Sequence, residues 1–201
     1  MVQAISDVGN SPHFNAANTF VYDAYGKAIA SIDPVGNVKQ SNYGAFENLT
    51  SSIADFGPGR LNVTTSLGYD TTGNITAITD ANGRTKTMAY DGARRLLTTT
   101  APAPFNAGST LVQTANAYDA DGHLTSVTRS NGSTNQLVTT SYTPTGKVLA
   151  VTDANNNRTA RTYDLNDRLQ SVTQPVSAGI NRVTRFNYDA MNRLTSTHYP
   201  K

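Results

Sequence analysis

The chain of 201 residues has 16 basic and 14 acidic side chains and a formal net charge of +2, and because nearly all its basic residues are scattered singly it offers no basic stripe for nucleic acid. The absence of Cys excludes disulfides, thiolate catalysis and Cys-ligated metal sites. This segment shows neither a signal peptide nor the roughly 18-residue apolar run of a membrane helix, so we expect no membrane span in it.

The composition favours an all-β fold, because Thr suits pleated strands while Asn, Asp and Gly suit tight turns. A tyrosine returns every 21 to 28 residues along the chain, which is typical of a repeat architecture. The eight tyrosines that anchor the repeats are Tyr22, Tyr43, Tyr69, Tyr90, Tyr118, Tyr142, Tyr163 and Tyr188.

The residues after each anchor keep a fixed phase. Asp follows directly in six of the eight repeats. Gly stands four residues after the tyrosine in four of the eight, where it indicates a position with positive φ. Glu47 and Arg94 occupy that position in two other repeats, which indicates that the requirement is not absolute. We predict a structural role for the tyrosines and for the residues that define the repeat with them: Asp23, Asp70, Asp91, Asp119, Asp164, Asp189, Gly26, Gly73, Gly122 and Gly146.

Polarity alternates at two fixed positions of every repeat. The residue six after the tyrosine is apolar, from Ala28 in the first repeat to Leu194 in the last, and the residue five after it is polar. This pattern predicts a strand with a buried residue beside a solvated one. In four repeats a second apolar residue follows three positions later, as Ile78 follows Ile75. That spacing breaks strict alternation and predicts a β-bulge or a strong local twist.

A second turn of variable length closes each repeat. Short repeats turn at Asp33, Asp80 or Asp153, and long repeats have polar or Pro/Gly-rich loops at 55–60, 102–109, 130–136 and 175–181. Hairpin therefore follows hairpin without a helix.

We predict one repeat array over residues 1–201. It has a partial, degenerate repeat at 1–21, in which Asp7 begins an echo of the Asp33 turn, then eight tyrosine-anchored repeats over 22–194, the last truncated, and a cut-off tail at 195–201. Repeats bury their apolar faces against neighbours. The partners expected at the strand edges are therefore neighbouring repeats or other copies of the chain.

The Tyr-Asp-x-x-Gly unit with its Asp-x-x-Gly middle turn resembles the YD repeat of the Rhs family, which includes bacterial Rhs proteins, C components of insecticidal Tc toxins, and teneurins. Residues 22–199 carry the resemblance. It implies consecutive antiparallel hairpins in a curved or spiralling sheet, as a segment of a shell-like wall. The family's self-cleaving aspartyl site has no counterpart here. Asp33-Pro34-Val35-Gly36 is similar to that motif but fills the place of a turn.

By this resemblance the function is structural. The chain would be part of a shell that encloses a C-terminal toxic cargo, without cofactor, metal or catalytic activity of its own, in a protein that is secreted or delivered to another cell. The alternative is a cell-surface adhesion or carbohydrate-binding module, with glycans as possible partners, in which the repeated tyrosines stack on sugar rings.

Two metal hypotheses rest on the Asp residues. The Asp after each tyrosine could be a metal or catalytic carboxylate, but recurrence at one phase favours a side chain that accepts N–H bonds within its turn. Asp153, Asn155 and Asn157, with Asp164, are similar to a calcium loop but lack its Gly and its bidentate Glu.

The histidines give no pattern of a catalytic site. His13, His123 and His198 lie in different repeats, and His123 stands at the position that we expect to be solvated. Neither a Ser-His-Asp triad nor a metal-ligand spacing is indicated, and we predict that the chain is not an enzyme.

Overall fold

The computed structural model describes residues 2–5, 17–102, 111–177 and 179–199, and within them the regular elements are 17 β-strands. The chain divides into two compact units, one of Met1–Arg95 with Thr100–Pro102 and one of Leu96–Thr99 with Ala103–Lys201. Each is described by itself. The turn predicted at Asp7, His13 and most of the 102–109 loop lie outside the described residues.

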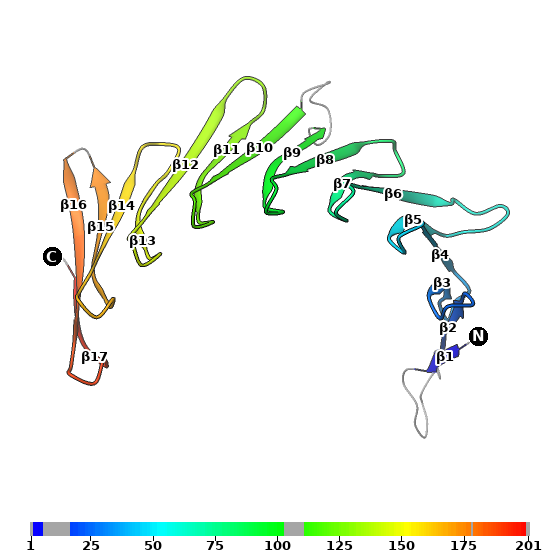
Figure 1. Ribbon diagram of the computed structural model, residues 1–201, viewed down its shortest axis with the longest axis horizontal. Helices are drawn as coiled ribbons and strands as arrows, with labels where there is room; N and C mark the ends of the chain where they lie inside the picture. The colour runs from blue at the N-terminus through cyan, green and yellow to red at the C-terminus, as the bar shows by residue number, and fades with distance from the viewer. Residues whose placement is uncertain (1, 6–16, 103–110, 178, 200–201) are drawn as a thin grey trace. The chain divides into compact units, whose positions relative to one another are not determined.

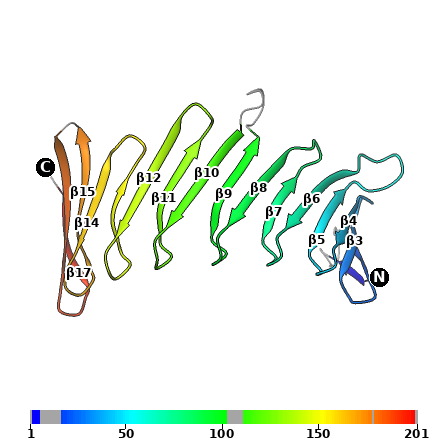
Figure 2. The same cartoon turned by 45° about the horizontal axis from the view of Figure 1, so that its top comes forward.

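The first unit is a sheet in which each strand pairs antiparallel with its neighbour in the chain. Figures 1 and 2 show these strands side by side in chain order. They are β1 (Val2–Ile5), β2 (Ala17–Tyr22), β3 (Ala28–Ile32), β4 (Val38–Tyr43), β5 (Leu49–Ala54), β6 (Val63–Tyr69), β7 (Ile75–Thr79) and β8 (Thr85–Tyr90), and β9 (Leu96–Pro102) is shared between the units.

The second unit repeats this plan of consecutive antiparallel pairs. Its strands are β10 (Leu111–Tyr118), β11 (Leu124–Ser130), β12 (Asn135–Tyr142), β13 (Val148–Thr152), β14 (Arg158–Tyr163), β15 (Leu169–Ser177), β16 (Ile180–Tyr188) and β17 (Leu194–His198). The predicted all-β fold of consecutive antiparallel hairpins is therefore confirmed. No helix among the described residues is long and apolar enough to cross a membrane.

A β-bulge occurs at the same place in the repeats, as predicted. In one example Tyr69 lies opposite Ile75, Gly68 opposite Ala77 and Leu67 opposite Ile78, so that Thr76 is the extra residue. The inserted residue restores Ile75 and Ile78 to one face, which explains their spacing of three. The same register shift occurs at Tyr22, Tyr43, Tyr69, Tyr118, Tyr142, Tyr163 and Tyr188.

Threonine at the bulge provides a local hydrogen bond. The hydroxyls of Thr50, Thr125 and Thr195 each donate to the carbonyl of the residue before the tyrosine, at 3.1, 3.1 and 3.0 Å. The bulge leaves the ladder locally disrupted, and these side chains add a bond where the strand bends.

The turn after each tyrosine has one conformation in all eight repeats. The residue four after the tyrosine has positive φ, from 60° to 89°, whether it is Gly or not. Glu47 (61°) and Arg94 (63°) adopt it too, so the expectation that the requirement is relaxed there is wrong. These side chains tolerate a left-handed backbone because the hairpin geometry on both sides imposes it.

Burial is shallow throughout the described residues. Ala150, at 4% exposure, is their one buried hydrophobic residue. The apolar positions six after the tyrosine are half-buried in seven repeats, and Leu194 is 53% exposed. The prediction of a buried residue at this position is therefore wrong, because no second layer packs on the described strands of either unit.

We predict that Gly73→Ala lowers the free energy of unfolding by about 1–2 kcal/mol, the cost of a left-handed L-residue. Gly73 has φ of 86° and open space around an added Cβ, so backbone strain alone acts. Gly92 is the matched control: it also has open space but no positive φ, and Gly92→Ala should be neutral or slightly stabilising. Urea denaturation of both variants measures this, and equal effects would contradict the interpretation.

Candidate functional site: the tyrosine and aspartate ladder

The tyrosine hydroxyls join each repeat to the one before it. Each donates to the backbone carbonyl of the residue that stands six after the preceding tyrosine, at 2.8–3.0 Å. The pairs are Tyr43 with Ala28, Tyr69 with Leu49, Tyr90 with Ile75, Tyr118 with Leu96, Tyr142 with Leu124, Tyr163 with Val148, and Tyr188 with Leu169.

These bonds lie where the strand pairing between repeats stops. β3 pairs with β4 only from Ala30 opposite Gln40 onward, which leaves the Ala28 carbonyl beyond the end of the ladder. The same limit holds between β7 and β8, and between β13 and β14. A strand carbonyl that has lost its ladder partner needs a donor. The half-buried tyrosine supplies one, so its ring fills the space and its hydroxyl completes the pairing.

The residue five after one tyrosine covers the ring of the next. Lys27 Nζ lies 4.8 Å from the Tyr43 ring centroid, and the Arg168 guanidinium lies 4.9 Å from that of Tyr188. Lys147 lies 6.0 Å from the Tyr163 ring in the same way, and His123 stacks on Tyr142 with ring centroids 4.7 Å apart. Cation–π contacts of this kind stabilise by about 0.5–1 kcal/mol where they are exposed.

The Asp after the tyrosine organises its turn. In every such turn one carboxylate oxygen, Oδ1, accepts the backbone N–H groups two and four residues later, at 2.8–3.1 Å. The second turns at Asp33, Asp80 and Asp153 use the same geometry. Thr143 replaces Asp in one repeat, and its hydroxyl accepts the Lys147 N–H at 3.0 Å.

The second carboxylate oxygen explains why the position five after the tyrosine is polar. Oδ2 accepts from Asn74 Nδ2 in one turn, and from Nε of Arg95, Arg168 and Arg193 in others, at 2.6–2.9 Å. The side chain of Arg168 is only 22% exposed, and His123, at 33%, bonds Asp119 at 3.1 Å. The prediction of a solvated residue is therefore wrong for Arg168 and His123, each of which is held between its own Asp and the next tyrosine. It holds for Arg193, whose side chain is 75% exposed.

Neighbouring turns along this edge are also joined directly. Lys27 Nζ donates to both the carbonyl oxygen and Oε2 of Glu47 at 3.0 Å. Arg168 Nη1 donates to the Asp189 carbonyl at 3.1 Å and to Asn192 Oδ1 at 3.0 Å. The Arg94 guanidinium donates to the Thr72 carbonyl. Each contact joins one repeat to the next on the side where the tyrosines lie.

Hydrogen bonding within the turns lowers the pKa of several carboxylates. The Asn74 side chain is the largest cause of the lowered pKa of Asp70, about 2 against an ordinary 3.8. The side chains of Asn37 and Asn157 lower the pKa of Asp33 and Asp153 in the same way. For Asp91, Asp164 and Asp189 the backbone N–H of the Arg four residues later is the largest cause of the lowered pKa.

The candidate calcium loop is not assembled. Asp153 lies in the turn before β14 and Asp164 in the turn after it, so the length of a six-residue strand separates them. Asp153 is moreover engaged by its own turn, with Oδ2 accepting from Asn157 Nδ2 at 3.0 Å. The structure therefore does not bring these carboxylates to one ion.

A cluster that the sequence reasoning missed lies in one turn of the second unit. The ligand atoms of Asp119, Asp121 and His123 lie within 4.8 Å of one another. The available signal was Asp-x-Asp-x-His across a five-residue turn. Asp119 and His123 bond each other as the equivalent residues do in other repeats, so the arrangement is explained by the turn itself.

Comparison with protein-family models matches residues 69–103 and 142–178 to the RHS Repeat. A comparison with curated proteins gives no match. Among solved structures, the crystal structure of TcdB2-TccC3-Cdc42 resembles 92% of this chain with a TM-score of 0.71 and 16% identity. A Tc holotoxin pore of Photorhabdus luminescens resembles 90% with a TM-score of 0.69 and 16% identity. This chain spans about a tenth of each of those chains, 10% in both cases.

We predict that Tyr69→Phe lowers the free energy of unfolding by about 1 kcal/mol, because it leaves the Leu49 carbonyl without its donor while it keeps the ring. Tyr25→Phe is the control, since Tyr25 is 92% exposed in a turn and should tolerate loss of its hydroxyl. Urea denaturation of both variants measures the difference. A stability of Tyr69→Phe equal to that of the parent chain would exclude an energetic role for this bond.

The lowered pKa of Asp70 predicts a loss of stability in acid. Its stabilising contribution is present above the unfolded pKa near 3.9 and should be lost as the pH falls from about 4 to the folded pKa of about 2. Carboxyl NMR titration should show that Asn74→Ala raises the pKa of Asp70 toward 3.8. Asn48→Ala is the control, because Asn48 holds the same place in a turn that begins with Gly44. An unchanged pKa in Asn74→Ala would contradict the assigned cause.

Proposed function

Because this chain carries RHS repeats, we propose that it forms a stretch of wall in a larger shell that encloses a toxic cargo, and that it has no catalytic activity of its own. Its partners are then the neighbouring repeats of that wall and the enclosed toxin, in a protein that is secreted or delivered to another cell. The prediction that residues 1–201 form one array belongs to this proposal.

The hydroxyl ladder is the observation that carries the proposal. Each tyrosine completes the hydrogen bonding of the repeat before it, so a repeat is finished only by its successor. This mode of stabilisation is that of an array whose members contact nearest neighbours. It suits a protein in which a large continuous sheet is formed through contacts between neighbouring repeats.

The exposed surface supports a larger assembly. Among the described residues Ala150 is the one buried hydrophobic residue, and large side chains such as Tyr25, Phe46 and Leu165 are at least 89% exposed. Both faces of the sheet carry half-buried apolar side chains. Such a sheet gains stability when further protein covers it.

The solved structures that resemble this chain agree with this interpretation at the level of fold. They are about ten times longer, and one of them is a Tc holotoxin pore. A wall of that length could surround a cargo, whereas a sheet of 201 residues would supply one part of it.

The state of the carboxylates supports a structural role. In the Asp turns one oxygen accepts two backbone N–H groups, and in several the other accepts a side chain. A carboxylate with a lowered pKa and occupied lone pairs is a poor general acid or base near neutral pH.

The carbohydrate-binding alternative loses support at four repeats. There a Lys, Arg or His side chain lies over one face of the tyrosine ring. A sugar would have to displace that side chain, or use the opposite face, in order to stack on the ring.

We expect the native product to be several times larger than 21.4 kDa, the mass of this chain. An antibody raised against the purified chain would be used to immunoblot lysate of the source cells, with antibody pre-absorbed on that chain as the control. A large band removed by pre-absorption would support the shell. A band near 21.4 kDa alone would overturn it, because a wall segment of this length cannot enclose a cargo.

A further inference from the structure

A recess in the second unit lies where the β11–β12 hairpin extends past its shorter neighbour. β12 pairs with β13 only as far as Thr139, whereas its pairing with β11 continues to Asn135. Val138 and Gln136 of β12 therefore have a paired strand on one side and none on the other. The space beside them has a volume of about 350 Å³ and is bounded by Ala154, in the turn after β13. Such a volume is typical of small-molecule sites.

The floor of the recess is apolar. Val127 lies directly opposite Val138 in the register, so the two side chains stand next to each other on one face of the sheet. Both line the recess together with Ala154, and both are half-buried. A ligand that covers these side chains removes apolar surface from water, which favours binding.

The other end of the recess is cationic. Arg129 lies directly opposite Gln136, and both exposed side chains line the recess. Each stands two residues from a valine of the floor, which is about 7 Å along a strand. The Gln136 amide nitrogen is a hydrogen-bond donor, and the forked guanidinium of Arg129 matches the geometry of a carboxylate.

The described part of the chain supplies no carboxylate for Arg129. Its strands contain neither Asp nor Glu, because the acidic residues lie in turns and loops. Asp153 stands next to Ala154, but its Oδ1 accepts the N–H groups of Asn155 and Asn157, and its Oδ2 accepts from Asn157 Nδ2. The Arg129 guanidinium is thus placed beside an apolar surface without an anionic partner from these residues.

We propose that this recess binds a short straight-chain aliphatic carboxylate such as hexanoate. The carboxylate pairs with the Arg129 guanidinium and accepts from Gln136 Nε2, while the hydrocarbon chain lies on Val127 and Val138 and ends at Ala154. An extended six-carbon chain is about as long as the 7 Å between the cationic and the apolar pair. This binding function goes beyond the proposed wall and does not depend on it.

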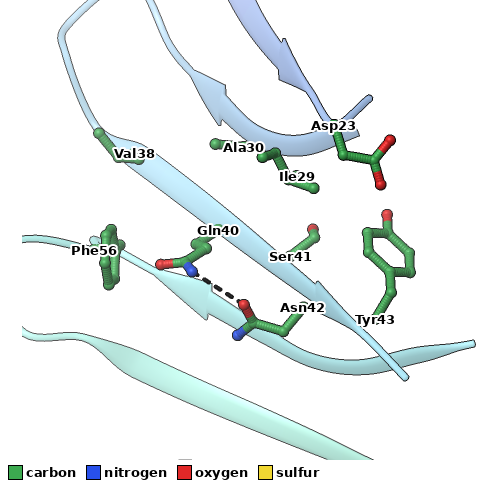
Figure 3. Close-up of a pocket in the computed structure, with 9 residues that line it drawn as sticks. All are labelled: Asp23, Ile29, Ala30, Val38, Gln40, Ser41, Asn42, Tyr43 and Phe56. Carbon is green, nitrogen blue, oxygen red and sulfur yellow. Dashed lines mark hydrogen bonds between the residues drawn. The ribbon is translucent and has the colours of Figure 1, made fainter. Parts of the chain in front are cut away.

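Two other recesses lack this combination of charge and apolar surface. The one over β3 and β4 (Figure 3) includes the Asp23 carboxylate and no basic side chain, which disfavours an anion. The one at Arg185, on β15 and β16, has Gln170, Ser171 and Asn187 around the guanidinium and no aliphatic side chain. It therefore offers a charge without a surface for a hydrocarbon chain.

Titration of the full ¹⁵N-labelled chain with sodium hexanoate, followed by NMR, tests the proposal. We expect saturable shifts of the backbone amides of Val138 and Ala154 and of the Gln136 side-chain amide. Sodium acetate keeps the charge and 1-hexanol keeps the hydrocarbon chain. Each should bind about tenfold more weakly than hexanoate, because each makes only one of the two contacts.

Variants separate the two contacts. Arg129→Gln removes the charge and should weaken hexanoate binding about tenfold. Val138→Thr keeps the shape of the side chain but adds a hydroxyl under the hydrocarbon chain, and it should weaken binding as well. Arg185→Gln is the matched control, since it removes an exposed Arg from the other recess of the same unit, and it should leave binding unchanged.

Four results would overturn the proposal. They are absence of saturation by hexanoate, equal binding by Arg129→Gln and the parent chain, binding of 1-hexanol as tight as that of hexanoate, and tighter binding of N-acetyl-leucine. The third would reduce the site to an apolar patch, and the fourth would assign it to the C-terminus of a polypeptide. The spectrum of each variant shows whether it is folded, and Arg129→Gln serves if Val138→Thr is not.

Discussion

The architecture depends on a phenol hydroxyl that donates to a backbone carbonyl in the preceding repeat. Pairing between repeats ends before the tyrosine, and the carbonyl six residues after the previous anchor is left beyond the ladder. The tyrosine closes that gap with one bond and one ring. Because both partners lie at fixed phases, the bond recurs wherever the repeat does, and the sheet is built from it without a conventional core.

The other features that recur in the repeats place the tyrosine hydroxyl and its carbonyl acceptor within bonding distance. The bulge after the turn returns the strand to the correct face, and the Asp-centred turn fixes where that strand begins. In two repeats the polar residue at the end of the turn contacts both its own Asp and the next tyrosine: Arg168 contacts Asp164 and Tyr188, and His123 contacts Asp119 and Tyr142. Hydrogen bonds, ion pairs and aromatic contacts are thus concentrated at the tyrosine turns. These directional contacts compensate for the shallow burial of the side chains.

The sequence predicted the repeats, the hairpins, the bulge and the positive-φ position, because each leaves a mark at a fixed spacing. It did not predict that Glu47 and Arg94 share that backbone conformation, since side-chain identity alone suggested a relaxed requirement. It misjudged the polar position after the turn, because polarity looks the same whether a side chain meets water or a carboxylate. Contacts between repeats, such as that of Lys27 with Tyr43, depend on the register across strands, which the spacing of residues along the sequence does not show.

The turns at the two ends of the strands are under different structural constraints. Repeats vary from 21 to 28 residues, and the turns after the tyrosines stay constant while the opposite turns range from the five residues 33–37 to the longer loop over 55–62. The turns after the tyrosines are thus joined to one another by side-chain contacts, whereas the turns at the opposite ends of the strands can accept insertions. A gene for such a protein can gain loops in the turns opposite the tyrosines without a change in strand order. Affinity tags or reporter peptides inserted in those turns would leave the contacts of the tyrosine turns unchanged.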